Sequence, residues 1–131
     1  MRFVSPEFIL LNAKAATGID KAMLVRDFQH ILLTLSSQDS ANFTVKFQGS
    51  QSETMPDFAA AQSATNEWDY IQVKDYQDNA SIAGDTGVAF AGTDDVRMFE
   101  ANTNGLNWIC ARVTARSAGS VNVKGRGYSV V

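Results

Sequence analysis

Side chains able to act as a nucleophile, base or metal ligand are few in this chain. It has one histidine, His30, and one cysteine, Cys110, in 131 residues. One imidazole and one thiol do not fill a tetrahedral zinc site, and neither a G-x-S-x-G sequence nor the surroundings of a catalytic cysteine are present. Both residues lie in alternating strand patterns, where a surface histidine and a small buried cysteine are the ordinary interpretation. We therefore expect no catalytic residues, no metal and no enzymatic activity.

Acidic turns are the next candidates for a ligand site. Asp94 and Asp95 share a turn with Gly92, and Asp85 lies in the preceding loop. If the two turns meet, their carboxylates offer oxygen ligands for calcium. Adjacent aspartates in a turn more often hydrogen-bond their own backbone. The phosphate-binding patterns G-x-G-x-x-G and G-x-x-x-x-G-K-[ST] are absent, so we expect no cofactor.

Aromatic residues offer a third kind of site. Sugar-binding sandwiches stack pyranose rings on exposed aromatic side chains, and the candidates here are Trp68, Tyr70, Tyr76 and Trp108. Trp108 shares the strand parity of Arg112, which predicts a position outside the core. Such rings also cap a sandwich or line a contact between subunits, where Trp and Tyr are enriched. A carbohydrate- or receptor-binding module therefore stays open beside a structural role.

Length and composition predict one folded domain spanning residues 1 to 131. Apolar residues make up 45% and charged residues 19% of the chain, which suffices for a core. The net charge of −3 and the scattered basic residues argue against binding nucleic acid. No run approaches the roughly twenty apolar residues of a membrane-spanning helix, so no membrane partner is expected. Pro6 interrupts the apolar N-terminus, and we therefore expect no signal peptide and a protein kept inside a cell.

The longest strand pattern covers Leu106 to Tyr128. Apolar and polar residues alternate on both sides of the turn-forming sequence SAGS at 117–120, which predicts a β-hairpin. An earlier stretch, Phe28 to Ser50, matches it at a constant offset without a gap, so that Ile31 coincides with Ile109. The pattern predicts one hairpin used twice. Internal symmetry and chance similarity between hairpins are both open.

The other segments predict short strands joined by turns. Strands are expected at 68–75, 88–91 and 96–101. Residues 51–67 are a long connection without strand pattern. Residues 1–27 are the least regular part and are expected to form an N-terminal arm, with a short edge strand at Phe8 to Leu11. A helix over Ile19 to Phe28 is the weaker alternative, because its apolar residues are crowded rather than striped.

Seven to eight short strands with almost no helix predict an all-β fold. The favoured architecture is a two-sheet antiparallel β-sandwich, jelly-roll-like, with the irregular N-terminal arm outside the strand pattern. An immunoglobulin-like sandwich is the second choice, although its Cys and Trp framework is missing. Strand parity assigns a core between the sheets. Its members are Ile31, Leu33, Leu35, Phe43, Val45, Phe47, Ile71, Val73, Ile109, Ala111, Val113, Val121 and Val123.

A resemblance to a known class of proteins is carried by the stretches FTVKFQGSQ, WDYIQVKD, GVAFAGTDDVRMFEANTNGLNWICARVTA and GSVNVKGRGY. They combine alternating strands with turns of Gly, Ser, Asn and Asp. In this pattern residues 28 to 128 resemble the small β-sandwich decoration, or cement, proteins that bind the outside of tailed-bacteriophage heads. The resemblance implies a virion structural protein on the capsid exterior, made in the host cytoplasm, that binds the major capsid protein and further copies of itself. It transfers no individual functional residue.

Contacts with partners are expected at the arm and at one exposed ring. The candidate residues are Arg2, Phe3, Val4, Phe8 and Trp108. The arm has more apolar surface than a free tail exposes. It therefore either adds an edge strand to its own sandwich or reaches a neighbour by strand addition. The short apolar strand at 88–91 has no edge charge, so pairing of copies in a homodimer or homotrimer is also expected.

Overall fold

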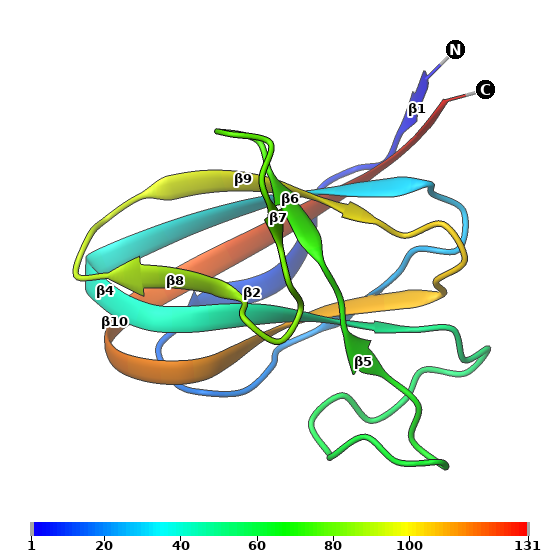
Figure 1. Cartoon of the computed structure of the whole chain (residues 1–131), viewed down its shortest axis with the longest axis horizontal. Helices are drawn as coiled ribbons and strands as arrows, with labels where there is room; N and C mark the ends of the chain where they lie inside the picture. Colours follow the sequence, from blue (N-terminus) through cyan, green and yellow to red (C-terminus); the bar gives the residue numbers. More distant parts are fainter. Residues whose placement is uncertain (1, 131) are drawn as a thin grey trace.

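The computed structural model describes residues 2–130, and in this range it contains ten β-strands and no helix (Figure 1). The strands are β1 Arg2–Val4, β2 Phe8–Lys14, β3 Ala22–Leu24, β4 His30–Ser50, β5 Asp69–Tyr70, β6 Val73–Asp75, β7 Ser81–Ile82, β8 Val88–Ala91, β9 Val96–Asn102 and β10 Trp108–Val130. All strand pairs are antiparallel, which confirms the all-β antiparallel fold. The helix considered over Ile19 to Phe28 is wrong, because β3 occupies that segment. Within residues 2–130 no helix has the length and apolarity needed to cross a membrane.

Two long strands, β4 and β10, run through the whole molecule. They pair with each other from Trp108 opposite Ser50 to Tyr128 opposite His30. The two predicted hairpins are therefore wrong, because each predicted turn is a bend within one continuous strand. Alternation of apolar and polar residues indicates which face of a strand is buried but not which strand lies beside it. A segment that folds back and pairs with itself shows the same alternation of apolar and polar residues as a bent segment that pairs with another strand.

The bends lie where the turn residues of the sequence lie. Asp39 and Ser40 have φ values of 63° and 53°, and Gly119 has a φ of 76°. A Cβ atom on Gly119 would come within 2.5 Å of the Ala41 Cα, so only glycine fits there. Register shifts between Val113 and Ser120 mark bulges that let both strands bend together.

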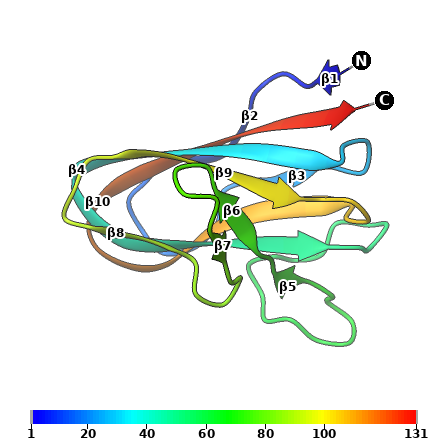
Figure 2. The same cartoon turned by 45° about the horizontal axis from the view of Figure 1, so that its top comes forward.

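Bending folds one hydrogen-bonded sheet into two facing layers (Figures 1 and 2). The first layer contains β1, β2, residues 120–130 of β10, residues 30–38 of β4, β9, β6 and β7. The second layer contains β3, residues 108–118 of β10, residues 42–50 of β4, β5 and β8. Ile31 lies opposite Gly127 in the first layer, and Ile109 lies opposite Gly49 in the second. Ile31 and Ile109, the two residues that the sequence offset aligned, therefore each lie opposite a glycine, one in each layer.

The core lies between the layers. Every residue assigned to it from strand parity is buried except Ile71, which is half-buried and packs against the cluster. Ile71 lies between β5 and β6, because the strand predicted at 68–75 is interrupted there. Leu10 and Leu11 of β2 are also fully buried. The predicted edge strand at Phe8 to Leu11 is therefore confirmed as part of the protein's own sandwich, and it extends to Lys14.

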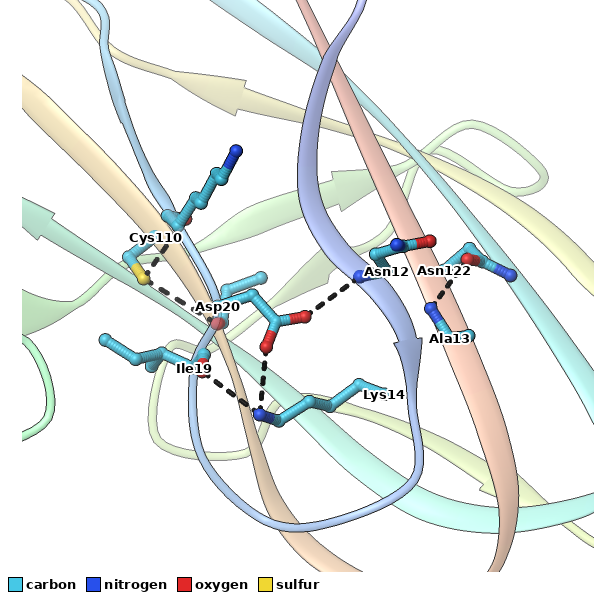
Figure 3. A network of polar contacts seen from close by, with 9 residues as sticks. Asn12, Ala13, Lys14, Ile19, Asp20, Cys110 and Asn122 are labelled. Atoms are coloured by element: carbon cyan, nitrogen blue, oxygen red, sulfur yellow. Dashed lines mark hydrogen bonds and ion pairs between the residues drawn. The ribbon is translucent and has the colours of Figure 1, made fainter.

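Polar contacts hold the segment after β2 against the body (Figure 3). The Lys14 Nζ lies 2.9 Å from Asp20 Oδ1 and donates a hydrogen bond to the Ile19 carbonyl at 3.1 Å. The other carboxylate oxygen of Asp20 accepts a hydrogen bond from the Asn12 amide at 2.9 Å. These contacts close residues 14–20 into a loop, so this part of the N-terminal segment is an ordered element of the fold.

Candidate functional site

The outer faces of the two layers differ in what covers them. Residues 51–67, here called the cover loop, lie over the outer face of the second layer and bury Phe58 against Cys110 and Trp68. On the outer face of the first layer, Val96 and Met98 are 68% and 56% exposed. The sequence predicted a long connection at 51–67, but it did not indicate which face of the sandwich this connection covers. A single phenylalanine in a polar segment is too weak a pattern to indicate a second buried cluster.

Hydrogen bonds fix the cover loop in place. The Phe58 carbonyl accepts hydrogen bonds from Gln48 Nε2 at 2.9 Å and from the Arg112 guanidinium at 3.3 Å. The Trp68 indole donates to the Ala60 carbonyl at 3.1 Å, and the Trp108 indole donates to the Ser52 carbonyl at 3.1 Å. Trp108 is half-buried and packs against the cluster of Phe58, Trp68 and Cys110.

An open groove of about 740 Å³ lies between the cover loop and residues 17–18. Its floor is the outer face of β10. The residues that give it chemical character are Thr17, Gln62, Trp68, Tyr70, Arg112 and Thr114. Aromatic rings, an amide, hydroxyls and one guanidinium therefore converge on one surface, as in sites that orient a polar ligand.

The aromatic residues singled out from the sequence divide between separate places. Trp68 and Tyr70 line the groove with ring centroids 5.1 Å apart and an interplanar angle of 76°. The Lys46 Nζ lies 5.0 Å from the centroid of the Tyr70 ring. Trp108 instead binds the cover loop, and Tyr76 lies beside the first layer. The groove therefore brings together two of the four candidate rings, Trp68 and Tyr70, while Trp108 packs against the same buried cluster without lining the groove.

A second polar cluster lies on the first layer around Glu100. Its carboxylate accepts hydrogen bonds from the Tyr76 and Tyr128 hydroxyls at 2.8 and 2.7 Å, and the His30 Nδ1 lies 3.0 Å from its other oxygen. The rings of His30 and Tyr128 stack with centroids 5.1 Å apart. His30 is thus the half-exposed rim histidine that strand parity predicted.

The electrostatics of this cluster follow from its contacts. Burial by itself raises the pKa of Glu100, but hydrogen bonds from Tyr128 and Tyr76, with the charges of His30 and Lys74, outweigh burial and lower that pKa. Burial and the adjacent carboxylate raise the pKa of Tyr76 and of Tyr128. Both phenols therefore stay protonated and donate to Glu100. The cluster ties β4, β9, β10 and the end of β6 together.

Among the remaining candidates for chemistry, Asp94 and Cys110 are engaged in structural contacts, and Asp85 is exposed. An Asp94 carboxylate oxygen accepts a hydrogen bond from the Ser40 amide at 2.9 Å, at the bend of β4. No three His, Cys, Asp or Glu side chains of residues 2–130 come together as a metal site. The Cys110 thiol is buried and donates to the Lys21 carbonyl at 3.6 Å, and burial raises its pKa to about 12. A thiol with this pKa is protonated near neutral pH and is a poor nucleophile.

The candidate partner residues fall into two groups. Arg2, Phe3 and Val4 form β1, which pairs with Tyr128 to Val130 of β10, and this N-terminal ribbon projects from the body beside both termini (Figure 1). Phe8 lies at the start of β2, next to the ribbon, and is 39% exposed. Trp108 lies in the second layer. The structure therefore brings the arm residues together and separates Trp108 from them.

Comparison with known proteins gives a shared fold. No protein-family model matches the chain, and no curated protein matches its sequence. The crystal structure of the SPBc2 prophage-derived protein YomS matches with a TM-score of 0.71 and 16% identity, over 98% of this chain and 96% of that chain. The crystal structure of the PBSX exported protein XepA matches with a TM-score of 0.70 and 16% identity, over 98% of this chain and 38% of that chain. At this identity the two comparisons describe the fold alone.

Proposed function

We propose that the protein is a bacteriophage structural protein that decorates a capsid and stabilises it by bridging major capsid protein subunits. Two solved structures with the same fold support a phage origin, since one is described as a prophage-derived protein and the other as a PBSX exported protein. The resemblance of residues 28 to 128 to capsid cement proteins supports the finer assignment. In this role the protein acts on the capsid exterior through binding and not through catalysis.

The N-terminal ribbon is the observation that carries the proposal. Phe3, Val4 and Val130 of the ribbon are 54%, 46% and 59% exposed, and Phe8 and Ile9 beside it are 39% and 49% exposed. These are half of the large hydrophobic side chains exposed in the described residues, so apolar surface is concentrated there. β1 ends the sheet, and in residues 2–130 its outer edge has no strand partner. An apolar strand with a free edge suits strand addition to a partner.

A capsid-binding assay tests the proposal with matched variants. Protein is sedimented with shells of the major capsid protein encoded by the same genome, as the wild type, as Phe3→Ser and as Met98→Ser. Phe3 and Met98 are 54% and 56% exposed, so the substitutions change similar areas at different places. We expect the ribbon variant to lose binding and Met98→Ser to retain it. Absence of the wild-type protein from purified virions would reject the capsid role.

Truncation gives a second test, and the structure decides its length. Leu10 and Leu11 are fully buried, so deleting residues 1–11 would remove part of the core. Deleting residues 1–5 removes β1 and leaves β2 in place. We expect this protein to melt near the wild-type temperature and to lose capsid binding. A large drop in melting temperature would show that β1 serves the fold.

Self-association is part of the proposal, because decoration proteins gather at symmetry axes. β1 and β8 are two edges that copies can share, because among the described strands β1 pairs only with β10 and β8 only with β4. We expect a homodimer or homotrimer, measured by light scattering at tens of micromolar protein. A monomer under these conditions would count against it.

The groove beside Tyr70 favours a second candidate function, a carbohydrate- or receptor-binding module of a phage tail. Exposed ring surface next to hydroxyl and amide groups is suited to sugars. A glycan array separates the two functions. Retention lost on Tyr70→Ala but kept on Trp108→Ala would favour the module, because Tyr70 lines the groove and Trp108 holds the cover loop.

A further inference from the structure

Two cations lie directly opposite each other on the outer face of the second layer. Arg112 of β10 is in register with Lys46 of β4. Directly opposite residues of an antiparallel pair have Cβ atoms about 4.5–5.5 Å apart on the same face, and like charges at such a position are destabilising. Both side chains are half-buried, so water screens their repulsion less than it does on an open surface.

No acidic partner compensates this pair. Among residues 2–130 no carboxylate oxygen lies within 4.0 Å of the Lys46 ammonium or of the Arg112 guanidinium. In the same range four Lys and Arg side chains do have such a partner, namely Lys14, Arg97, Lys124 and Arg126. Lys46 and Arg112 differ from the other unpaired basic residues in that they lie directly opposite each other and are both half-buried. The local potential therefore favours an anion at this place.

The surrounding side chains hold the cations in position and leave bonding capacity free. Arg112 donates one hydrogen bond to the Phe58 carbonyl at 3.3 Å, which leaves most of its five donors available. The Lys46 Nζ lies above the Tyr70 ring, an arrangement that fixes an ammonium without neutralising it. The side-chain hydroxyls of Thr17, Tyr70 and Thr114 have no hydrogen-bond partner within the described part of the chain, and Arg112 lines the groove together with all three.

We propose that this groove binds a carboxylate or phosphate group carried by a carbohydrate chain. Arg112, which lines the groove, is the anion-binding residue, and Lys46 beside the groove, between Arg112 and the Tyr70 ring, adds a second positive charge. A guanidinium matches the geometry of either anion through paired hydrogen bonds, and the ammonium adds a second charge. Tyr70 and the free hydroxyls then contact the sugar. The proposal rests on the second candidate function and is independent of capsid binding through the N-terminal ribbon.

The lining of the groove favours a sugar over a lipid surface. Binding to a membrane through an amphipathic surface buries large apolar side chains in the headgroup region. None of the large hydrophobic residues that are exposed in residues 2–130 lines this groove. Hydroxyl, amide and aromatic groups do line it, and these are the groups that match a sugar.

Titration calorimetry with defined probes tests the proposal on the full chain. The probes are oligogalacturonate for carboxylates, polyglycerol phosphate for phosphates, a neutral malto-oligosaccharide, and phosphatidylglycerol vesicles. We expect binding of at least one of the two acidic polymers, weakened by added salt, and no binding of the neutral sugar. Arg112→Gln and Lys46→Gln are each expected to weaken binding by about tenfold or more, the effect of losing a hydrogen bond to a charged group.

Controls separate a specific site from general charge. Lys124→Gln and Arg126→Gln remove the same charges from the first layer, where both side chains lie about half exposed near Glu7, and should leave the affinity unchanged. Lys46→Gln should also leave the melting temperature unchanged or raise it, because it removes a like-charge pair. Equal losses in the control variants, equal binding of the neutral sugar, binding to vesicles alone, or no binding at all would each overturn the proposal. Arg112→Gln should still sediment with the capsid shells, because the groove is separate from the N-terminal ribbon. Failure of polymer binding can therefore be told apart from failure of capsid binding.

Discussion

The two outer faces of this sandwich differ in what covers them, although the strands of both layers have similar patterns of apolar and polar residues. Both layers are built from halves of β4 and β10, and in both an apolar side faces the core. On the second layer the cover loop adds a small buried cluster of Phe58, Trp68 and Cys110. On the first layer Val96 and Met98 lie exposed. The difference comes from a polar connection whose own sequence has no strand pattern.

The polar groups of the two faces differ as well. On the uncovered face Glu100 has two hydroxyl donors and an adjacent imidazole, so its charge is compensated. On the covered face Arg112 and Lys46 lie opposite each other without an acidic partner in residues 2–130. A compensated cluster stabilises the fold, whereas an uncompensated pair costs stability. This contrast is the reason why we propose ligand binding on the covered face.

The largest expected effect concerns the core that both faces share. Phe47 is 1% exposed and Phe43 is 3% exposed, and both point between the layers. Phe47→Ala and Phe43→Ala should each lower the free energy of unfolding by about 3–5 kcal/mol, because each leaves a cavity. Urea titration measures the change. A loss below about 1 kcal/mol at both positions would contradict the assigned parity of β4.

A slightly smaller effect is expected at the anchor of the cover loop. Phe58 is 2% exposed, and Phe58→Ala should cost about 3 kcal/mol. The same variant should expose Cys110, which the wild type buries. Labelling of the native protein with a thiol reagent at mildly alkaline pH should therefore be slow in the wild type and faster in the variant. Equal labelling rates would show that the loop does not shield Cys110.

A pH-dependent effect is expected on the uncovered face. Because the folded pKa of Glu100 is lowered from its ordinary value of 4.5, its contribution to stability is present above that value and is lost as the pH falls through the folded pKa. Glu100→Gln should cost about 1–2 kcal/mol at neutral pH through weaker hydrogen bonds from the two tyrosines. Its deficit relative to the wild type should shrink as the pH is lowered below about 4.5.

Unfolding curves measured across the acid range test this, with Glu7→Gln as the control. Glu7 has a side chain that is 56% exposed and lies 4.0 Å from the nearest cations, so its removal should have little effect at any pH. A deficit in Glu100→Gln that stays constant with pH would show that its charge does not matter.

The smallest effect is expected where the first layer is bare. Met98 is 56% exposed and points away from the core, so Met98→Ser should change the free energy of unfolding by no more than about 0.5 kcal/mol. Thermal or urea unfolding measures it. A loss above about 1 kcal/mol would indicate that something covers this face in solution, such as a second copy.

Much of the fold could be predicted, because the alternation of apolar and polar residues along a strand indicates which of its sides is buried. Alternation with a period of two identified Ile31, Val45 and Val123 as core residues, and all three are fully buried. It also located β8 and β9, and the edge strand at Phe8. Leu10 and Leu11 are both buried although they are adjacent, because β2 has register shifts against β10. A pattern of strict alternation does not reveal such a bulge.

The candidate site was predicted only in part. Strand parity placed Trp108 and Arg112 on the outer side of the strand. It did not indicate that the cover loop would bind Trp108, or that this loop would form one side of a groove lined by Arg112. The alignment of Lys46 with Arg112 depends on β4 pairing with β10, and each segment had been assigned to a hairpin with itself. Residues 62 and 17 reach the same groove from loops that carry no periodic signal.

By itself the sequence determined that this chain forms antiparallel strands, which side of each strand is buried, and where the chain bends. These properties depend on residues close together in the chain, namely the alternation of side chains and the turn-forming residues near Ser40 and Gly119. The tertiary structure decided that β4 pairs with β10, that residues 51–67 cover one layer, and that Arg112 lies opposite Lys46. These properties arise from contacts between segments far apart in the chain, where several pairings satisfy the same local pattern and only packing and hydrogen bonding of the whole molecule select one.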